Sequence, residues 1–335
     1  MKKIFFFCLV LCVITADAAD KNKKLAQTGF KFLNVATDPR SVAMGEAVTS
    51  VEGTSQSLFF NPAGMARMSQ SVQMTFGSTQ WIADINHMYG SIAINTPDND
   101  YGVFGITFQT VDYGDLDRTI YTESNADKYL DMGTFSPIAM AVGIGYARSL
   151  SDRFSIGGRI SYALQDLGDG FATTTSGTNN PVASKNSANT LSYDFGMFYK
   201  TGLKSLNFAV SIKNFSKEIK YQREGFQLPL MFRIGISANA MDFISESQDA
   251  DQLLLSVDAT NSRDYPETIN MGGEYVFMKL LAIRAGYMFD QDEHGFTAGV
   301  GIQQSLEGIG LGIDYAYTPF GIFGNINRFS IQLYL

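Results

Sequence analysis

The sequence contains almost no cysteine, and this absence excludes a large part of protein chemistry. Its two cysteines, Cys8 and Cys12, lie in an amino-terminal stretch ordered like a secretory signal peptide. A basic start and an apolar run over 4–14 precede Ala16-Asp17-Ala18, which fits an A-x-A cleavage site. We therefore expect residues 1–18 to be removed. The mature chain then has no thiol, which excludes disulfides, thiolate metal sites and cysteine nucleophiles.

Histidine and basic patches are also scarce. The chain has two histidines, His87 and His294, far apart in sequence, and it contains neither an HExxH nor a G-x-S-x-G motif. Acidic residues outnumber basic ones by 33 to 25, a net charge of −8 at pH 7, without a basic cluster. We therefore expect no enzyme activity, no catalytic residue, no cofactor and no bound metal. A nucleic-acid partner is not expected either.

Long apolar runs are absent from the mature chain, whereas a spanning helix needs about 20 apolar residues. The chain instead alternates apolar with small or polar residues. In 309–317, Ile309, Leu311, Ile313, Tyr315 and Tyr317 alternate with glycine, aspartate and alanine. Side chains of a strand point to opposite faces in turn, so such a run has one apolar and one polar face. Many segments of about 10 residues of this kind are typical of a transmembrane β-barrel.

The alternation recurs fourteen times after residue 69, at roughly 70–79, 86–96, 102–112, 137–149, 153–164, 190–200, 205–213, 229–240, 251–260, 267–277, 280–289, 295–304, 308–318 and 325–335. Most connections alternate between short and long, which is the pattern of periplasmic turns and outer loops. One connection, 241–250, is too long for a turn. The pattern predicts an all-β fold, a 14-stranded antiparallel barrel over 70–335, in the bacterial outer membrane and in contact with its lipid.

Charged residues fall on the less apolar face of these strands. We expect the following to point into the lumen: Arg159, Asp194, Lys213, Arg233, Asp258, Glu274, Arg284 and Asp314. A charge on the lipid face costs up to about 2–4 kcal/mol at the midplane of the bilayer. Their mixed signs favour ion pairs across the lumen. Two interpretations stay open, namely charges that hold the interior together and charges that line a polar route or ligand site.

Aromatic residues at the strand ends suit the girdles that mark both membrane interfaces. We expect this role for Trp81, Tyr89, Tyr113, Tyr146, Tyr162, Tyr199, Tyr275, Tyr287 and Tyr317. The two histidines are expected at the interface as well.

Residues 25–69 contain apolar clusters without strand alternation, such as Phe30, Phe32 and Leu33. Such a segment is too apolar to hang free in the periplasm, while the small residues on the inner face of the barrel leave room for it. The sequence therefore predicts that 19–69 form a hatch inside the lumen. Asn61-Pro62-Ala63-Gly64 favours a turn there, which either anchors the hatch or moves when cargo engages.

Three ordered segments carry a family resemblance. They are Gly29-Phe30-Lys31-Phe32-Leu33, the stretch from Asp38 to Ala47 with Arg40 and Gly45, and Phe60-Asn61-Pro62-Ala63-Gly64. With Arg284-Ala285-Gly286-Tyr287 and Asp314-Tyr315 near the carboxyl end, the chain resembles the PorV/PorQ family, which is related to FadL-type transporters. The resemblance implies a fourteen-stranded barrel with an Asn-Pro-Ala motif in an N-terminal hatch.

The resemblance leaves two functions open. PorV-like members act in type IX secretion, and their partners are secreted cargo proteins and secretion-system components. FadL-like members pass long-chain fatty acids or other hydrophobic small molecules into the membrane. The connection 165–189 is rich in Gly, Thr, Ser and Asn, and 113–136 carries several aspartates. These polar loops favour protein partners, so we expect protein secretion and keep hydrophobic transport as the alternative.

Overall fold

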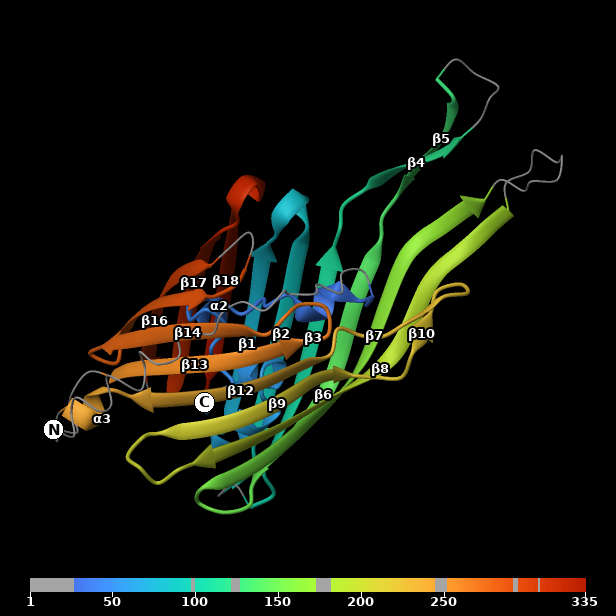
Figure 1. Ribbon diagram of the computed structural model, residues 1–335. Coiled ribbons are helices and arrows are strands. Elements are labelled where there is room, and N and C mark those ends of the chain that lie inside the picture. The colour runs from blue at the N-terminus through green and yellow to red at the C-terminus, as the bar shows by residue number, and fades with distance from the viewer. Residues whose placement is uncertain are drawn as a thin grey trace.

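The computed structural model describes residues 27–97, 100–121, 127–172, 182–244, 252–291, 295–306 and 308–335. The expected signal peptide and His294 lie outside these residues. Fourteen strands pair in antiparallel register and close into a barrel, which confirms the predicted fold (Figure 1). Consecutive barrel strands are neighbours, and the first, β1, pairs with the last, β18.

The barrel strands are β1 (Val72–Gln80), β2 (Asn86–Asn95), β3 (Val103–Asp112), β6 (Ile138–Ser149), β7 (Phe154–Ala172), β8 (Val182–Lys200), β9 (Asn207–Phe215), β12 (Met231–Asn239), β13 (Gln252–Ser262), β14 (Thr268–Phe277), β15 (Leu281–Met288), β16 (Phe296–Leu306), β17 (Ile309–Pro319) and β18 (Asn325–Tyr334). Most of these strands begin and end within two residues of the positions predicted from the sequence. The exceptions are the outer ends of β7 and β8, which continue as paired strands into the connection expected to be a loop.

Side chains alternate between the two faces of the wall as the sequence predicts. Along β17, the apolar residues from Ile309 to Tyr317 are 37–55% exposed, whereas Asp314, Ala316 and Thr318 are at most 1% exposed. The exposed set is on the outer face of a closed barrel, where a bilayer covers it. Aliphatic and aromatic residues form the same outer face on the other strands. The chain is therefore an outer-membrane barrel. No helix among the described residues is long and apolar enough to cross a bilayer, a finding that concerns helices alone.

Hairpins and short helices complete the connections. The outer connection after β3 carries the hairpin of β4 (Leu116–Tyr121) and β5 (Tyr129–Phe135), which projects well beyond the barrel (Figure 1). The connection after β9 carries β10 (Ile219–Lys220) and β11 (Gly225–Phe226). The short helices η4 (Ile82–Asp84) and η6 (Gly321–Phe323) lie in two further outer connections, and α3 (Met241–Ile244) begins the long periplasmic one.

The segment before β1 runs through the inside of the barrel. It contains η1 (Lys31–Asn34), α2 (Pro39–Ala43), η2 (Ser55–Phe59) and η3 (Pro62–Arg67). The helix α2 packs against β15 to β18, and η3 packs against β6 to β8. At its outer end Thr28 bridges to Gln227, and at its periplasmic end Met68 accepts a hydrogen bond from Asn95. The segment thus spans the lumen from the outer mouth to the periplasmic opening.

Glycines in the wall allow this segment to approach the strands closely. A Cβ at Gly272 would lie 2.2 Å from the carbonyl oxygen of Met44, and one at Gly286 would lie 2.0 Å from the amide nitrogen of Gly45. Both distances are shorter than any Cβ contact in a folded protein tolerates. The small inner residues noted in the sequence therefore make room for the segment rather than for an open pore.

The alternation predicts how the wall tolerates charge. Ile313 lies in the middle of β17 with its side chain toward lipid, 40% exposed. Ile313→Arg should lower the free energy of unfolding by about 2–4 kcal/mol, because it places a charge near the midplane of the bilayer. Urea unfolding in lipid vesicles measures this. Ile313→Leu, which keeps an apolar side chain, should change stability by less than about 1.5 kcal/mol; equal losses from the two variants would contradict the assigned faces.

Candidate functional site

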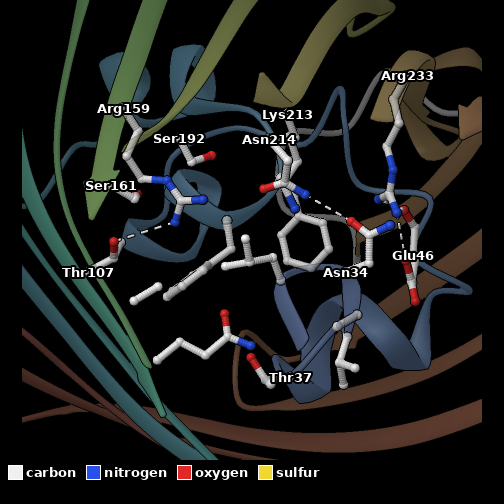
Figure 2. Close-up of a pocket in the computed structure, with 17 residues that line it drawn as sticks. Asn34, Thr37, Glu46, Thr107, Arg159, Ser161, Ser192, Lys213, Asn214 and Arg233 are labelled. Atoms are coloured by element: carbon white, nitrogen blue, oxygen red, sulfur yellow. Dashed lines mark hydrogen bonds and ion pairs between the residues drawn. The ribbon is translucent and has the colours of Figure 1, made fainter. Parts of the chain in front are cut away.

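An internal cavity lies between the N-terminal segment and one side of the barrel wall (Figure 2). Residues 33–37 and the pair Phe59 and Phe60 form its inner side. Strands β3, β6, β7, β8, β9 and β12 supply the outer side. Its volume is about 20 Å³. The polar and charged residues in its lining are Asn34, Thr37, Glu46, Thr107, Gln109, Arg159, Ser161, Ser192, Lys213, Asn214 and Arg233.

The Asn61-Pro62-Ala63-Gly64 turn begins η3 and ties the segment to the wall. Asn61 is the N-cap residue, and its side-chain oxygen accepts a hydrogen bond from the amide of Ala63 at 3.1 Å. Its amide nitrogen donates to Thr49 O at 2.8 Å and to Met197 O of β8 at 3.1 Å. Pro62 occupies the first helical position, where its missing N–H costs nothing. The turn therefore joins two parts of the segment to one strand.

Arg40 and Gly45 anchor an earlier part of the segment. Arg40 donates two hydrogen bonds to Glu274 of β14, at 2.9 and 2.7 Å, in a bidentate ion pair. Gly45 has a φ of 62° and donates its amide to Thr297 Oγ1 at 3.1 Å. A positive φ at this close approach favours glycine. Both residues from the family-like stretch therefore contact the wall.

Glu274 is also part of a larger buried network. Arg284 donates to Glu274 at 2.5 Å and to Asp314 at 2.5 Å, and Gln332 donates to the second oxygen of Asp314. All of these side chains are buried. Charged hydrogen bonds of this kind are stronger than neutral ones. The network therefore joins β14, β15, β17 and β18 to the N-terminal segment through Arg40.

The remaining lumen charges have partners nearby. Arg159 donates to Asp194 at 2.8 and 2.5 Å on the neighbouring strand. Arg233 pairs with Glu46 of the N-terminal segment at 2.7 Å, and Asp258 accepts the amide of Thr49 at 2.9 Å. The sequence interpretation expected pairs across the lumen. The pairs described above run between nearby strands or to the segment, because the segment occupies the space between opposite walls.

Three residues expected at the membrane interface lie elsewhere, and one of them is Tyr113, which packs against the buried apolar cluster that contains Phe30 and Phe32. Tyr89 is 1% exposed, faces inward and donates to Asp38 Oδ1 at 3.1 Å. His87 is on the same inner face of β2, 2% exposed, with its ring edge-on to Trp81 at 6.0 Å. The signal that places them was present in the sequence, because Met88, Ile92 and Ile94 occupy the opposite, apolar face. Glu46 and Asp38, which bind Arg233 and Tyr89, were missed because nothing in the segment's sequence reveals partners so distant.

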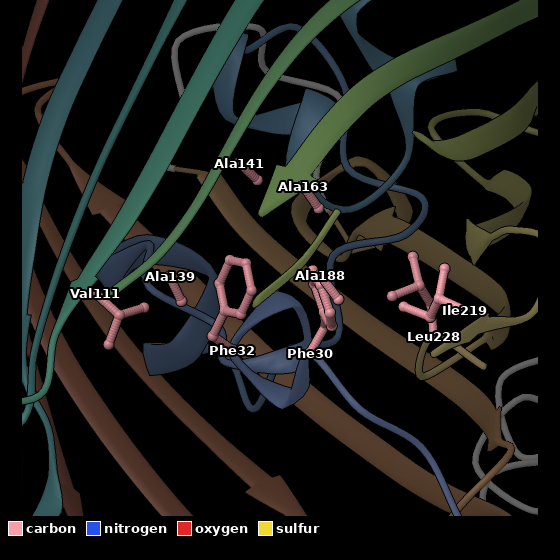
Figure 3. Close-up of a cluster of buried hydrophobic side chains, with 9 residues drawn as sticks. All are labelled: Phe30, Phe32, Val111, Ala139, Ala141, Ala163, Ala188, Ile219 and Leu228. Atoms are coloured by element: carbon pink, nitrogen blue, oxygen red, sulfur yellow. The ribbon is translucent and has the colours of Figure 1, made fainter. Parts of the chain in front are cut away.

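A cluster of apolar side chains closes the outer mouth (Figure 3). The ring of Phe30 stacks on the ring of Tyr221, with 6.3 Å between the ring centres, and its centre lies 6.2 Å from that of Phe226. Tyr221 and Phe226 both belong to the β10–β11 hairpin. Lys31 forms an ion pair with Asp264 in the connection after β13. Burial raises the pKa of the Tyr221 phenol above its ordinary value, so Tyr221 stays protonated and donates to Gln165 at 2.7 Å. The outer connections thus hold the start of the segment.

A hollow of about 690 Å³ lies on the lipid-facing side of the same wall. Its lining is mostly apolar and includes Phe104, Ile106, Ile144, Ile160 and Phe195 from β3, β6, β7 and β8. Gly158 points outward at this hollow with no side chain to fill it. Arg159, the next residue, lines both the hollow and the internal cavity. The two spaces are therefore separated by a wall one strand thick.

Solved barrels share this fold. The toluene transporter TbuX of Ralstonia pickettii is 11% identical, with a TM-score of 0.57 over 88% of this chain and 96% of that one. A FadL homologue of Pseudomonas aeruginosa is 11% identical, with a TM-score of 0.54 over 90% and 98%. The Pseudomonas putida toluene transporter TodX is 10% identical, with a TM-score of 0.55 over 88% and 95%. No family model and no curated protein matches. The likeness to FadL-type channels shows the fold, and the PorV/PorQ resemblance stays a prediction.

The buried charge network predicts a large effect of removing one member. Arg284→Met leaves the carboxylates of Glu274 and Asp314 without their shared partner. It should lower the free energy of unfolding by about 3–5 kcal/mol, the usual cost of breaking a buried ion pair. Unfolding in lipid vesicles at pH 7 measures this. The exposed Lys279→Met, in the turn after β14, loses the same charge and should change stability by less than about 1 kcal/mol; a similar loss would mean that net charge, not the network, sets stability.

Proposed function

We propose that this barrel carries hydrophobic small molecules across the outer membrane and releases them sideways through its wall. The observation that carries the proposal is the pair of spaces on either side of β7. An internal cavity and a larger apolar hollow toward lipid share Arg159 and are separated by one strand layer. An apolar recess that faces lipid does not help water to cross the barrel. It does favour an apolar compound that leaves the lumen, because burial of apolar surface away from water is favourable.

The wall is thin at this place because glycine replaces larger residues. Gly105 of β3, Gly145 of β6 and Gly158 of β7 all line the hollow. On its inner side Gly157 leaves space for Pro62, since a Cβ there would lie 2.6 Å from that residue's carbonyl carbon. Strands without side chains bend and separate more easily than packed ones. A sideways opening at Gly157 and Gly158 therefore breaks backbone pairs and moves the Pro62 turn, but it loses no side-chain packing from these two positions.

The N-terminal segment acts as a hatch in this proposal. Its residues from Thr28 to Met68 fill the lumen between the outer mouth and the periplasm, so a straight aqueous passage is blocked. A compound that enters at the apolar cluster around Phe30 next meets Leu33. Leu33 packs against that cluster and also lines the cavity. The solved barrels of similar fold include toluene transporters and monoaromatic hydrocarbon channels, and this supports a hydrophobic cargo.

Protein secretion, the function first expected from the sequence, gains no support. That expectation depended on a loose polar loop over 165–189. Its described parts are instead the outer ends of β7 and β8, paired from Asp169–Lys185 to Ala172–Val182. The solved structures of similar fold include a toluene transporter and a monoaromatic hydrocarbon channel. The alternative, hydrophobic transport, is therefore the function we propose.

Filling the hollow tests the sideways route. Gly158→Phe projects a ring into the lipid-facing hollow, and its Cβ meets no atom closer than 3.4 Å. The barrel should therefore fold, and uptake of radiolabelled toluene by cells expressing it should fall at least about fivefold. Cells without the barrel give the baseline.

Gly273→Phe is the matched control. Gly273 of β14 also faces lipid, on another part of the wall, and a Cβ there again meets no atom closer than 3.4 Å. Cells that express Gly273→Phe should take up as much toluene as cells that express the parent. Full uptake by the Gly158 variant, or equal loss in both variants, would show that the hollow is not on the route.

Removing the hatch tests the blocked lumen. A chain lacking 27–68 should fold as a barrel, since none of the strand pairs that close it includes a residue of the segment. Its conductance in planar bilayers should rise severalfold over the parent, because the lumen then fills with water. Arg40→Met, which keeps the segment and loses only its ion pair with Glu274, should raise conductance much less. A deleted barrel that is folded and conducts like the parent would place the barrier elsewhere.

A further inference from the structure

A further pocket, about 360 Å³ in volume, lies at the outer rim of the barrel and shares no lining residue with the internal cavity or the hollow. Two outer connections form it, the one with η4 between β1 and β2 and the one with η6 between β17 and β18. The polar and aromatic residues of this rim pocket are Gln80, Trp81, Asp84, Phe323, Asn325 and Asn327. Its volume falls within the roughly 300–1,000 Å³ of small-molecule sites.

The two connections hold each other in place. The rings of Trp81 and Phe320 meet edge-on, with 5.5 Å between their centres, and the guanidinium of Arg328 lies 5.5 Å from the ring centre of Trp81. Figure 1 shows the two turns side by side at the outer end of the barrel. Ala83 and Asp84 adopt left-handed φ angles of 55° and 59°. Alanine rarely adopts this conformation, and backbone strain of this kind gathers at binding sites.

The rim pocket lies where the lipid-facing surface of the wall ends. Asn325 and Asn327 are on the outward face of β18, in line with Phe329, Ile331 and Leu333, which face lipid and are 41–45% exposed. Alternate residues of a strand form one row on one face, so the asparagines continue the lipid-facing row beyond its apolar part. A lipid of the outer leaflet therefore reaches the pocket with its headgroup while its chains lie along the apolar part of the row.

The two asparagines supply hydrogen-bond donors. Tyr315 donates its hydroxyl to Asn327 Oδ1, and Tyr317 donates to Asn325 Oδ1, each at 2.7 Å. Each side-chain oxygen is thus held by a tyrosine of the neighbouring strand. The two amide nitrogens have no acceptor among the residues that the structure describes. Their N–H groups are therefore available to a ligand.

The charge of the lining disfavours an anionic ligand. Gln80 supplies a neutral amide and Asp84 a carboxylate, and neither lysine nor arginine is among the described residues that line the pocket. A phosphate headgroup would meet the charge of Asp84 without a cation to pair with. A neutral ligand with several hydroxyls donates to Asp84 and accepts from the amides. The exposed ring of Phe323 adds an apolar surface on which a sugar ring packs.

We propose that the rim pocket binds the neutral sugar headgroup of a glycolipid in the outer leaflet. The amides of Asn325, Asn327 and Gln80 donate to its hydroxyls. Asp84 accepts from one hydroxyl, and one face of the sugar ring packs on Phe323. The site is separate from the transport route and does not depend on it. A free sugar offers the same hydroxyls without chains, so the two sources of the sugar are distinguished by experiment.

The fluorescence of Trp81 reports on the pocket, because Trp81 lines it and is the single tryptophan of the chain. The full chain is placed in phosphatidylcholine nanodiscs with rising fractions of digalactosyl diacylglycerol, a glycolipid with a neutral headgroup. Trp81 emission should change and saturate, and native mass spectrometry should find the glycolipid retained by the protein. Anionic phosphatidylglycerol should do neither. Equal retention of the two lipids, or no retention of the glycolipid, overturns the proposal.

Lactose added to nanodiscs without glycolipid distinguishes the two sources. It carries hydroxyls of the same kind, but no chains hold it at the membrane. It should therefore change Trp81 emission only at a much higher concentration than the glycolipid does, since anchoring raises the effective concentration of a headgroup. Half-saturation by lactose at the same concentration as the glycolipid overturns the assignment to a lipid.

Asn325→Leu combined with Asn327→Leu keeps the size of both side chains and removes the donors. It should weaken glycolipid binding at least about tenfold, the effect of losing about two hydrogen bonds. Asn261→Leu, which changes an exposed asparagine at the outer end of β13, is the matched control and should bind like the parent. Heat-dependent mobility in electrophoresis shows that each barrel is folded. Parent-like binding by the folded double variant, or equal loss in the control, overturns the proposal.

A second variant covers the case in which the double variant does not fold. Asp84→Asn removes the charge and keeps a residue type that tolerates the φ of 59° at this position. It should weaken glycolipid binding severalfold, because hydrogen bonds to charged groups are the stronger ones; unchanged or tighter binding overturns the proposal. Gly158→Phe should lose toluene uptake and keep glycolipid binding, so failure of the site and failure of the transport route are distinguishable.

Discussion

The whole structure depends on one constraint, which is that every backbone N–H and C=O in the hydrocarbon of a bilayer must find a partner within the protein. The pairing of β1 with β18 meets it by removing both free edges. Their register runs from Gln73 opposite Tyr334 to Gln80 opposite Asn327, and the amide of Ser71 donates to Leu335 O at 2.7 Å. Once the sheet is closed, each strand has one face in lipid and one in the lumen. Charged side chains of the strands are therefore confined to the face in the lumen.

That restriction explains why the segment before β1 and the wall fit each other in charge as well as shape. Glu274 lies between Arg284 of the wall and Arg40 of the segment, and Arg233 of the wall pairs with Glu46 of the segment. Each side thus supplies counter-charges that the other needs in a space with little water.

The sequence predicted the barrel well because the signal is local. Side-chain alternation needs only neighbouring residues, and it located all fourteen strands. It failed at the outer ends of β7 and β8, where serine, glycine and asparagine leave no apolar face and cross-strand pairing alone extends the ladder. It also could not reveal the partner of Arg40, because Glu274 is 234 positions away in sequence. The same limit applies to the cavity, whose lining comes from six strands and the segment.

Two consecutive glycines show how the wall and the segment depend on each other. Gly157 faces inward against Pro62, and Gly158 faces outward at the hollow, so β7 has no side chain on either face at this point. Gly196 of β8 stands equally close to Asn61, where a Cβ would lie 1.9 Å from the side-chain oxygen. The Asn61-Pro62 turn therefore rests on the thinnest part of the wall. Since interiors pack without free space, a shift of β7 must move this turn, and a shift of the turn must leave β7 unsupported. In the proposed transport route, an opening toward lipid is thus coupled to a release of the segment by packing at a single site.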